Sequence, residues 1–438
     1  MKKPVFRQLE NKIRLVKAKI AVVGLGYVGL PLALEFVKKG FVVYGIEIDG
    51  ERLKRLKNRE AYITDVSVKA LRYALGSGKL IPFGNFKAIG DADAVVVCVP
   101  TPLKKKNLPD ISFIKKAVKE VSSYLKKGAL VVLESTTYPG TTEEVILPLL
   151  ESSGKKHGED FYLCFSPERI DPGNRLYPVS RIPKVIGGIN ADAGLLGRKL
   201  YRNIVGKVVL VSSTRVAEIT KLLENTFRIV NIGLVDELAM MAHKMNIDIW
   251  EVIRAASTKP FGFMPFYPGP GVGGHCIPKD PLYLYWKAKK FGFKSRFIKL
   301  SSDIISSMPA YVVRRVSALL AKKSPEGLNN ASVLVLGVTY KKDVKDLRQS
   351  PCLDIITLLK GLGVKVYYYD PLIPYLKFPG FDLRSSVISR KVLSKMDCVI
   401  VATDHSGVDY GFILKSSRLI FDARNVYRGV SSDKVVKL

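Results

Sequence analysis

Short apolar runs alternate with amphipathic stretches along the first half of the chain. The apolar runs end in turn residues and predict buried strands at Ile20–Val23, Phe41–Ile46, Ala94–Val99, Ala129–Leu133 and Tyr162–Phe165. Between them, helical spacing is found at Val28–Lys39, Ser112–Leu125 and Thr142–Glu151. Strands that alternate with helices predict an α/β fold with a parallel sheet covered on both faces.

The pattern changes at about Ser213, where long apolar-periodic stretches replace the strands. They predict helices at Val216–Met245, Ile247–Ala256 and Pro281–Lys290. A long apolar helix between two α/β halves suits a dimer surface, and burial within one chain explains it equally well.

After residues 324–330, which have the composition of a linker, the α/β pattern resumes. Strands are expected at Ser332–Leu336, Val364–Tyr369, Cys398–Ala402 and Leu419–Phe421, and a helical pattern begins at Asp354–Lys360. A chain of 438 residues is expected to hold two or three domains. We place them at residues 1–212, 213–323 and 324–438.

The formal net charge of +31 permits two interpretations. Basic residues neutralise phosphates in nucleic-acid-binding proteins, and they also surround active sites for small anions. Here they occur as scattered pairs, the longest run is Lys104–Lys106, and no nucleic-acid motif accompanies them. We therefore expect no nucleic-acid partner as a main function.

Five cysteines without a CxxC pair make a disulfide or metal framework improbable and fit a reducing cytoplasm. The basic N-terminus lacks the apolar region of a signal peptide. The apolar run Ala21–Phe36 contains glycines, a proline and a glutamate, so it falls short of a membrane span. We expect a cytoplasmic protein with no metal and no membrane partner.

Residues 24–29, GLGYVG, follow a strand and open a helix, as a dinucleotide-binding GxGxxG motif requires. Gly24 permits a tight turn, Gly26 lets the backbone approach a pyrophosphate, and Gly29 lets helix and strand pack closely. Glu47 stands where an acidic residue accepts the ribose hydroxyls and repels a 2′-phosphate, so NAD is expected rather than NADP. The alternative is a structural glycine turn.

The second α/β half opens with one glycine, Gly337, followed by Lys341 and Lys342. It lacks the dinucleotide motif. Lysines that follow a strand suit an anionic ligand other than a dinucleotide. The alternative interpretation is that they are ordinary solvated lysines at the surface.

Residues 268–281, PGPGVGGHCIPKDP, form a loop in which glycines and prolines fix the backbone without building a core. Its only strong nucleophile is Cys276, for which an inert buried thiol is the alternative. His275 is adjacent, but neighbouring side chains of an extended segment usually point apart.

Lys221 and Asn225 are four residues apart on one helical face, where they would stabilise an oxyanion or place a water, or else form a solvent-facing stripe. Polar residues also follow two strands, at residues 134–140 and 166–171. The carboxyl ends of parallel strands are where ligands bind.

These segments together resemble the UDP-sugar 6-dehydrogenases over nearly the whole chain. The motifs that carry the resemblance are GLGYVGLPLA, VPTPL, ESTTYPGTT, SPERIDPGN, STRVAEITKLLENTFR, PGPGVGGHCIPKDP and LGVTYKKDVKDLRQSP. The resemblance implies two Rossmann-like parallel-sheet domains, the first for NAD and the last for UDP, joined by a central helical dimerisation region. It implies a homodimer that oxidises C6 of a UDP-sugar twice, through a thiohemiacetal and a thioester on Cys276.

The resemblance also assigns the site residues. The catalytic set is Cys276, Lys221, Asn225, Asp280, Thr136 and Glu168. The cofactor set is Gly24, Gly26, Tyr27, Val28, Gly29, Glu47, Thr101, Thr136 and Arg348. The substrate set is Glu168, Arg169, Lys221, Asn225, Tyr267, Gly271, Gly273 and Lys341.

Within the family, residues 259–276 are most similar to enzymes that act on UDP-N-acetylglucosamine. UDP-glucose enzymes usually carry a serine where this chain has His275. UDP-N-acetylmannosamine, UDP-N-acetylgalactosamine and UDP-glucose remain alternatives. Two other classes of function are alternatives: a dehydrogenase that carries out only one oxidation, and a nucleic-acid-binding protein on the same scaffold. Neither would need Cys276.

Overall fold

The computed structural model describes residues 3–63, 66–104, 108–171, 174, 176–274, 276–323, 328, 330–378 and 380–438. The chain forms two compact units. The first unit is Met1–Glu224 with Leu282–Phe293, and the second unit is Asn225–Pro281 with Lys294–Leu438.

The first unit is built on an eight-stranded sheet with the order β10-β9-β8-β7-β4-β1-β2-β3. Neighbours pair in parallel, except for β8 and β9, which are antiparallel. The expected parallel sheet is therefore confirmed, with this one antiparallel pair in addition. The strands are β1 (Lys19–Val23), β2 (Val42–Ile46), β3 (Leu80–Phe83), β4 (Ala94–Val97), β7 (Ala129–Leu133), β8 (Phe161–Phe165), β9 (Lys184–Gly188) and β10 (Val208–Val211); a hairpin pairs β5 (Leu103–Lys104) with β6 (Leu108–Pro109).

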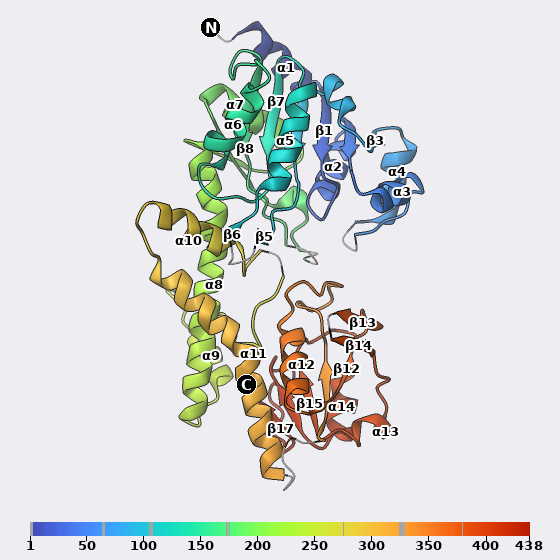
Figure 1. The fold of residues 1–438 in the computed structure, drawn as a ribbon, viewed down its shortest axis with the longest axis vertical. Coiled ribbons are helices and arrows are strands. Elements are labelled where there is room, and N and C mark those ends of the chain that lie inside the picture. Colours follow the sequence, from blue (N-terminus) through green and yellow to red (C-terminus); the bar gives the residue numbers. More distant parts are fainter. Residues whose placement is uncertain are drawn as a thin grey trace. The chain divides into compact units, whose positions relative to one another are not determined.

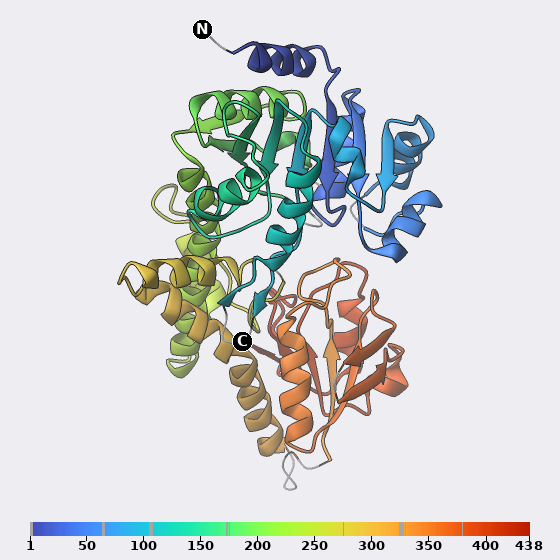
Figure 2. The same cartoon turned by 45° about the horizontal axis from the view of Figure 1, so that its top comes forward.

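Helices cover both faces of this sheet (Figure 1). Ile20 and Val22 of β1 belong to one apolar cluster, and Ala21 and Val23 belong to another, because alternate residues of a strand point to opposite faces. The helices are α1 (Pro4–Arg14), α2 (Gly29–Lys38), α3 (Gly50–Lys57), α4 (Val68–Gly76), α5 (Ser112–Tyr124), α6 (Leu147–Glu151) and α7 (Ala191–Arg202). The N-terminal helix α1, dark blue in Figure 2, packs on α7.

The helix expected at Thr142–Glu151 differs from an ordinary α-helix. Thr142–Ile146 is π-helical and only Leu147–Glu151, α6, is α-helical. Pro148 near the start of α6 has no N–H to donate to the preceding turn, so the α-helical ladder cannot run through it.

Four helices make up the middle of the chain: α8 (Thr214–Lys244), α9 (Ile249–Ala256), α10 (Asp280–Lys290) and α11 (Arg296–Lys323). The three helices expected here, near residues 216–245, 247–256 and 281–290, are confirmed. Among the described residues, Arg296–Lys322 is long and apolar enough to cross a membrane. Several of its buried side chains, among them Met308 and Val316, belong to the apolar core of the second unit, so we interpret α11 as a core helix.

The second unit has a five-stranded, all-parallel sheet with the order β12-β11-β15-β16-β17. The strands are β11 (Ser332–Leu336), β12 (Lys365–Tyr369), β15 (Cys398–Val401), β16 (Ile420–Asp422) and β17 (Val435–Lys437). The remaining elements are α12 (Pro351–Gly361), α13 (Arg390–Leu393), α14 (Tyr410–Ser416) and the antiparallel pair β13 (Tyr375–Phe378) and β14 (Phe381–Arg384). Most of the predicted linker at residues 324–330 lies outside the described residues.

Candidate active site

The glycine turn between β1 and α2 has the geometry that a dinucleotide requires. A Cβ on Gly29 would stand 1.9 Å from the carbonyl oxygen of Gly24, so only glycine fits there. A Cβ on Gly26 would meet its nearest described neighbour, Arg52 Nη1, only at 4.0 Å, which leaves the backbone open to a phosphate. Tyr27 and Val28 are half-buried at the N-terminus of α2. The turn therefore fits NAD.

Glu47 follows β2 and is buried beside this turn. Its Oε2 accepts a hydrogen bond from the Leu25 N–H at 3.1 Å, and its Oε1 accepts one from the Asp49 N–H at 3.0 Å. Arg52 Nη1 lies 3.8 Å from Oε2. The carboxylate thus braces the glycine turn, and the nearby cation offsets part of the repulsion that it would exert on a 2′-phosphate.

The predicted polar residues of the first unit lie after β7 and β8 and on α8. Thr136 is half-buried after β7, while Glu168, after β8, and Lys221, on α8, are both buried. Lys221 Nζ lies 4.0 Å from Glu168 Oε2, and Glu168 Oε1 accepts a hydrogen bond from the Ile170 N–H. The first unit therefore brings a cation and a carboxylate together where the sequence predicts them.

Arg169 and Thr101 have structural partners in the first unit. Arg169 forms an ion pair with Glu224 at 2.6 Å and donates to the carbonyl oxygen of Pro183. The buried Thr101 accepts a hydrogen bond from the Tyr283 hydroxyl at its carbonyl oxygen, at 2.8 Å. The ligand roles that the resemblance implies for these two residues stay predictions.

Glu218 is a buried carboxylate of the first unit that sequence reasoning missed. It accepts hydrogen bonds from the Gly140 N–H at 2.6 Å, and from the N–H and hydroxyl of Thr142 at 2.8 and 2.7 Å. Burial raises the pKa of Glu218 to about 7 against these donors. Glu218 precedes Lys221 by one helical turn, so α8 both holds the turn after β7 and presents the predicted cation.

In the second unit, the loop of residues 268–281 is packed against the connection between β11 and α12. Gly274 has φ +86°, and its N–H donates to the carbonyl oxygen of Arg348 at 2.9 Å. A Cβ on Gly274 would stand 2.7 Å from the Tyr340 ring, so a side chain there would collide with it. Gly271 and Gly273 are buried in the same loop, and Tyr267 stacks on Trp250.

Cys276 is the half-buried thiol of this loop, whereas the other four cysteines are buried. Its carbonyl oxygen accepts the N–H groups of Lys279 and Asp280, which turns the chain into α10. Burial, and then the charge of Arg348, lower the pKa of Lys279, while the charges of Cys276 and Asp280 raise it. The charges of Lys279 and Cys276 thus act on each other, which would favour a thiolate at Cys276, and sequence reasoning missed this relationship.

Two of the predicted catalytic residues, Asn225 and Asp280, are hydrogen-bonded to each other. Asn225 Nδ2 donates to Asp280 Oδ2 at 2.6 Å, and both side chains are buried. The second unit thus brings together Asn225, Asp280 and the Cys276 loop. His275 lies outside the described residues, so the expectation that it points away from Cys276 stays a prediction.

The turn after β11 carries Lys341 and Arg348, which is half exposed and bound to Asp346 through Nε and Nη2. Beneath the turn, the buried Asp370 accepts the N–H groups of Val338 and Thr339 and lies 3.1 Å from His405 Nε2. His405 Nδ1 accepts the Asp343 N–H at 3.1 Å. This buried pair, absent from the predicted site, fixes the backbone from which Lys341 projects.

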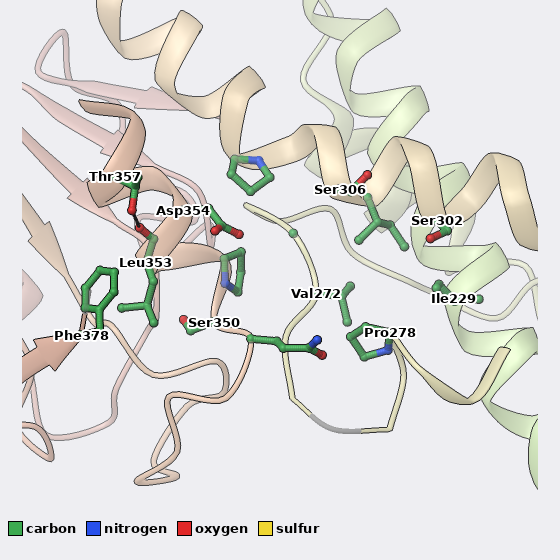
Figure 3. Close-up of a pocket in the computed structure, with 15 residues that line it drawn as sticks. Ile229, Val272, Pro278, Ser302, Ser306, Ser350, Leu353, Asp354, Thr357 and Phe378 are labelled. Atoms are coloured by element: carbon green, nitrogen blue, oxygen red, sulfur yellow. Dashed lines mark hydrogen bonds between the residues drawn. The ribbon is translucent and has the colours of Figure 1, made fainter. Parts of the chain in front are cut away.

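A cavity of about 490 Å³ borders the same loop in the second unit (Figure 3). Gly271, Val272 and Pro278 of the loop line it together with residues of α11 and of the start of α12, and Figure 3 labels Val272, Ser306 and Asp354 among these side chains. Burial raises the pKa of Asp354. Of the predicted site residues that the structure describes, Gly271 alone lines the cavity.

Family models of known proteins match this chain in three consecutive parts. The NAD-binding domain of the UDP-glucose/GDP-mannose dehydrogenase family matches residues 18–205, the central domain matches residues 215–304, and the UDP-binding domain matches residues 334–429.

Individual relatives are similar in sequence to this chain over most of its length. UDP-N-acetyl-D-mannosamine dehydrogenase of Pyrococcus horikoshii is 35% identical over 417 residues, which are 94% of this chain and 96% of the relative. The solved structure of the P. horikoshii UDP-D-ManNAc dehydrogenase has a TM-score of 0.86 and covers 96% of this chain and 98% of its own. UDP-N-acetyl-D-glucosamine 6-dehydrogenase of Pseudomonas aeruginosa is 41% identical over 355 residues, which are 81% of this chain and 82% of the relative. With its NAD-binding turn, the chain belongs to the UDP-glucose/GDP-mannose dehydrogenase family.

Proposed function

We propose that this NAD-dependent UDP-sugar 6-dehydrogenase oxidises a UDP-N-acetylhexosamine to its uronic acid, with Cys276 as the covalent catalyst. The observation that carries the proposal is the loop of residues 268–281. It holds a half-buried thiol whose charge interacts with that of Lys279, and it ends at the buried pair of Asn225 and Asp280. A loop fixed in this way supports nucleophilic catalysis better than a structural role.

Bound NAD, held by the turn of Gly24, Gly26 and Gly29 with Glu47 beside it, supplies the acceptor for both hydrides removed from C6. The thiolate of Cys276 adds to the aldehyde left by the first oxidation and forms a thiohemiacetal. The second oxidation leaves a thioester, which water cleaves to the acid and the thiol. Two NAD are thus reduced for each acid formed.

The remaining residues have separate roles in this proposal. Lys221 stabilises the oxyanion that develops at C6. Asp280, oriented by Asn225, activates the water that cleaves the thioester, and Thr136 and Glu168 assist at the proton transfers. The UDP-sugar is bound by Lys341, Tyr267, Gly271, Gly273 and Arg169. The cofactor is contacted by Arg348 and Thr101.

For the sugar, we propose UDP-N-acetylglucosamine, with the N-acetylmannosamine, N-acetylgalactosamine and glucose forms as alternatives. The similarity of residues 259–276 to UDP-N-acetylglucosamine enzymes supports the choice. A relative at 41% identity carries that substrate's name, while a relative at 35% identity over more of the chain is named for UDP-N-acetyl-D-mannosamine.

The experiment is to offer these four UDP-sugars in turn with NAD and to follow NADH by absorbance. UDP-N-acetylglucosamine should give the highest kcat/KM, and UDP-glucose should be turned over poorly. A preference for another N-acetylhexosamine would replace the sugar and keep the reaction. If none of the four reduces NAD, the proposed function is wrong.

We also propose that two copies pair through α8. Its exposed apolar side chains recur at helical spacing along one face. They are Val216, Ile219, Leu223, Phe227, Leu234 and Met241. In sedimentation experiments the protein should run as a dimer, and Leu223→Glu combined with Leu234→Glu should shift it to the monomer. The division at residues 1–212, 213–323 and 324–438 and the cytoplasmic location remain predictions.

A further inference from the structure

Asp236 is a fully buried carboxylate on α8, in the second unit, that the proposed mechanism does not use. Its Oδ1 accepts a hydrogen bond from the Gly269 N–H at 3.0 Å. Its Oδ2 is buried and has no hydrogen-bond partner within the described part of the chain. Burying a carboxyl group with a single hydrogen-bond partner costs folding free energy. We therefore interpret the hydrogen bond to Gly269, which an apolar residue could not form, as the reason for an aspartate at this position.

The partner of Asp236 is the only backbone donor at the entry to the Cys276 loop. Residues 268–270 are Pro-Gly-Pro, and prolines have no N–H, so Gly269 alone can donate there. Arg424 also lies close to this glycine, because a Cβ on Gly269 would stand 2.9 Å from Arg424 Nη1. The hydrogen bond from Gly269 to Asp236 therefore holds the loop at its entry.

The exit of the same segment is held by a backbone contact. The Gly274 N–H donates to the carbonyl oxygen of Arg348, two residues before Cys276. Residues 269–274 are therefore anchored at both ends, once by a side chain and once by the backbone. The side-chain anchor is the one that a substitution can remove.

We propose that Asp236 positions the loop that carries Cys276 by holding the N–H of Gly269. This inference rests on the proposed function, because it takes Cys276 as the nucleophile. Asp236 is a positioning residue and touches no reacting atom in this scheme. Burial raises the pKa of Asp236 to about 7 and the charge of Arg424 lowers it, but the acceptor at Oδ1 is present whether or not the group is ionised.

The test compares Asp236→Leu, which removes the acceptor at similar size, with Asp236→Asn, which keeps an acceptor oxygen for Gly269. The exposed neighbour on the same helix gives the matched control Glu237→Gln. Two quantities are measured in each purified full-length variant: kcat/KM with the preferred UDP-sugar, and the rate at which iodoacetamide alkylates Cys276, located by peptide mass spectrometry. Thermal unfolding reports whether each variant is folded.

The leucine variant should lose about tenfold to a hundredfold in kcat/KM, since misplaced groups cost that much, and its alkylation rate should change. The asparagine variant and the Glu237→Gln control should match the wild type in both readouts. A wild-type kcat/KM in the leucine variant overturns the proposal, and so does an asparagine variant as impaired as the leucine variant.

If Asp236→Leu does not fold, Asp236→Ser replaces it, because the serine side chain is too short to reach Gly269. A wild-type kcat/KM in the serine variant, or an asparagine variant as impaired as the serine variant, then overturns the proposal. Failure of the proposed function is seen separately, as a wild-type enzyme that makes no sugar acid. In that case the alkylation rates of the folded variants still show whether Asp236 holds the loop.

Discussion

Asn225 donates its side-chain N–H to the carboxylate of Asp280 at 2.6 Å, with both groups buried in the second unit. The two residues are 55 positions apart in sequence, and Asp280 begins α10 four residues after Cys276. The amide of Asn225 fixes the orientation of the Asp280 carboxylate, and a general base must be held in a fixed orientation toward the proton that it takes. This pair is the geometric basis for assigning thioester cleavage to Asp280.

Asp280→Asn should therefore slow thioester cleavage more than either oxidation. General-base contributions of about 10² to 10⁴ set the expected loss in kcat. Mass spectrometry of the quenched variant should show the sugar thioester accumulating on the peptide that holds Cys276. Asn225→Ala should show the same accumulation in weaker form. A variant that releases acid as fast as the wild type would remove Asp280 from this role.

The sequence predicts the parts of the site that lie in contiguous motifs. The glycine turn at residues 24–29 and the loop around Cys276 can be recognised from the sequence. Both contain positive φ angles and close approaches of the backbone, and few residues besides glycine are compatible with these. The central strands β1, β4 and β7 are also predicted, since a strand buried on both faces is a continuous apolar run.

Other parts could not be predicted, for identifiable reasons. β10 at the edge of its sheet is partly exposed along its length, and the hairpin strands β5 and β6 are two residues each, so neither gives a periodic signal. Glu218 and Asp236 contact backbone N–H groups 76 to 78 and 33 positions away, which no local pattern encodes. Lys279 becomes significant only through the fold of residues 276–280, which places its charge near the thiol.

The position of Glu47 leads to a prediction about the cofactor. Glu47→Gln keeps the size of the side chain but removes the charge that we expect to bind the ribose hydroxyls and to repel a 2′-phosphate. The KM for NAD should rise about tenfold or more, as expected when a hydrogen bond to a charged group is lost, and the preference for NAD over NADP should shrink. Steady-state kinetics with NAD and with NADP measure both the KM and the preference. Unchanged discrimination would assign the preference to another residue, and Arg52→Gln is the companion variant because Arg52 lies beside Glu47.

Glu218 predicts a pH dependence of stability. Its pKa in the folded protein is about 7, above the value near 4.3 expected in an unfolded chain. The folded state therefore binds this proton more tightly, so the stabilisation is fully present below about pH 4 and is lost as the pH rises to about 7. Urea unfolding should show the free energy of the wild type falling, relative to Glu218→Gln, by on the order of 3 kcal/mol over that range. A constant difference between the two proteins would contradict the raised pKa.

The last prediction separates the two oxidations. Removal of a hydride from an alcohol needs no thiol, whereas removal of the second hydride needs a tetrahedral adduct at C6, which the thiol of Cys276 supplies. The wild type should form two NADH for each acid. Cys276→Ser should lose most acid formation while the first oxidation survives weakly and reversibly. Lys221→Ala should slow turnover by about a hundredfold or more without changing the stoichiometry, because it removes oxyanion stabilisation. Product analysis by mass spectrometry beside NADH absorbance tests all three proteins, and a serine variant that makes the carboxylate at the wild-type rate would show that Cys276 is not a covalent catalyst.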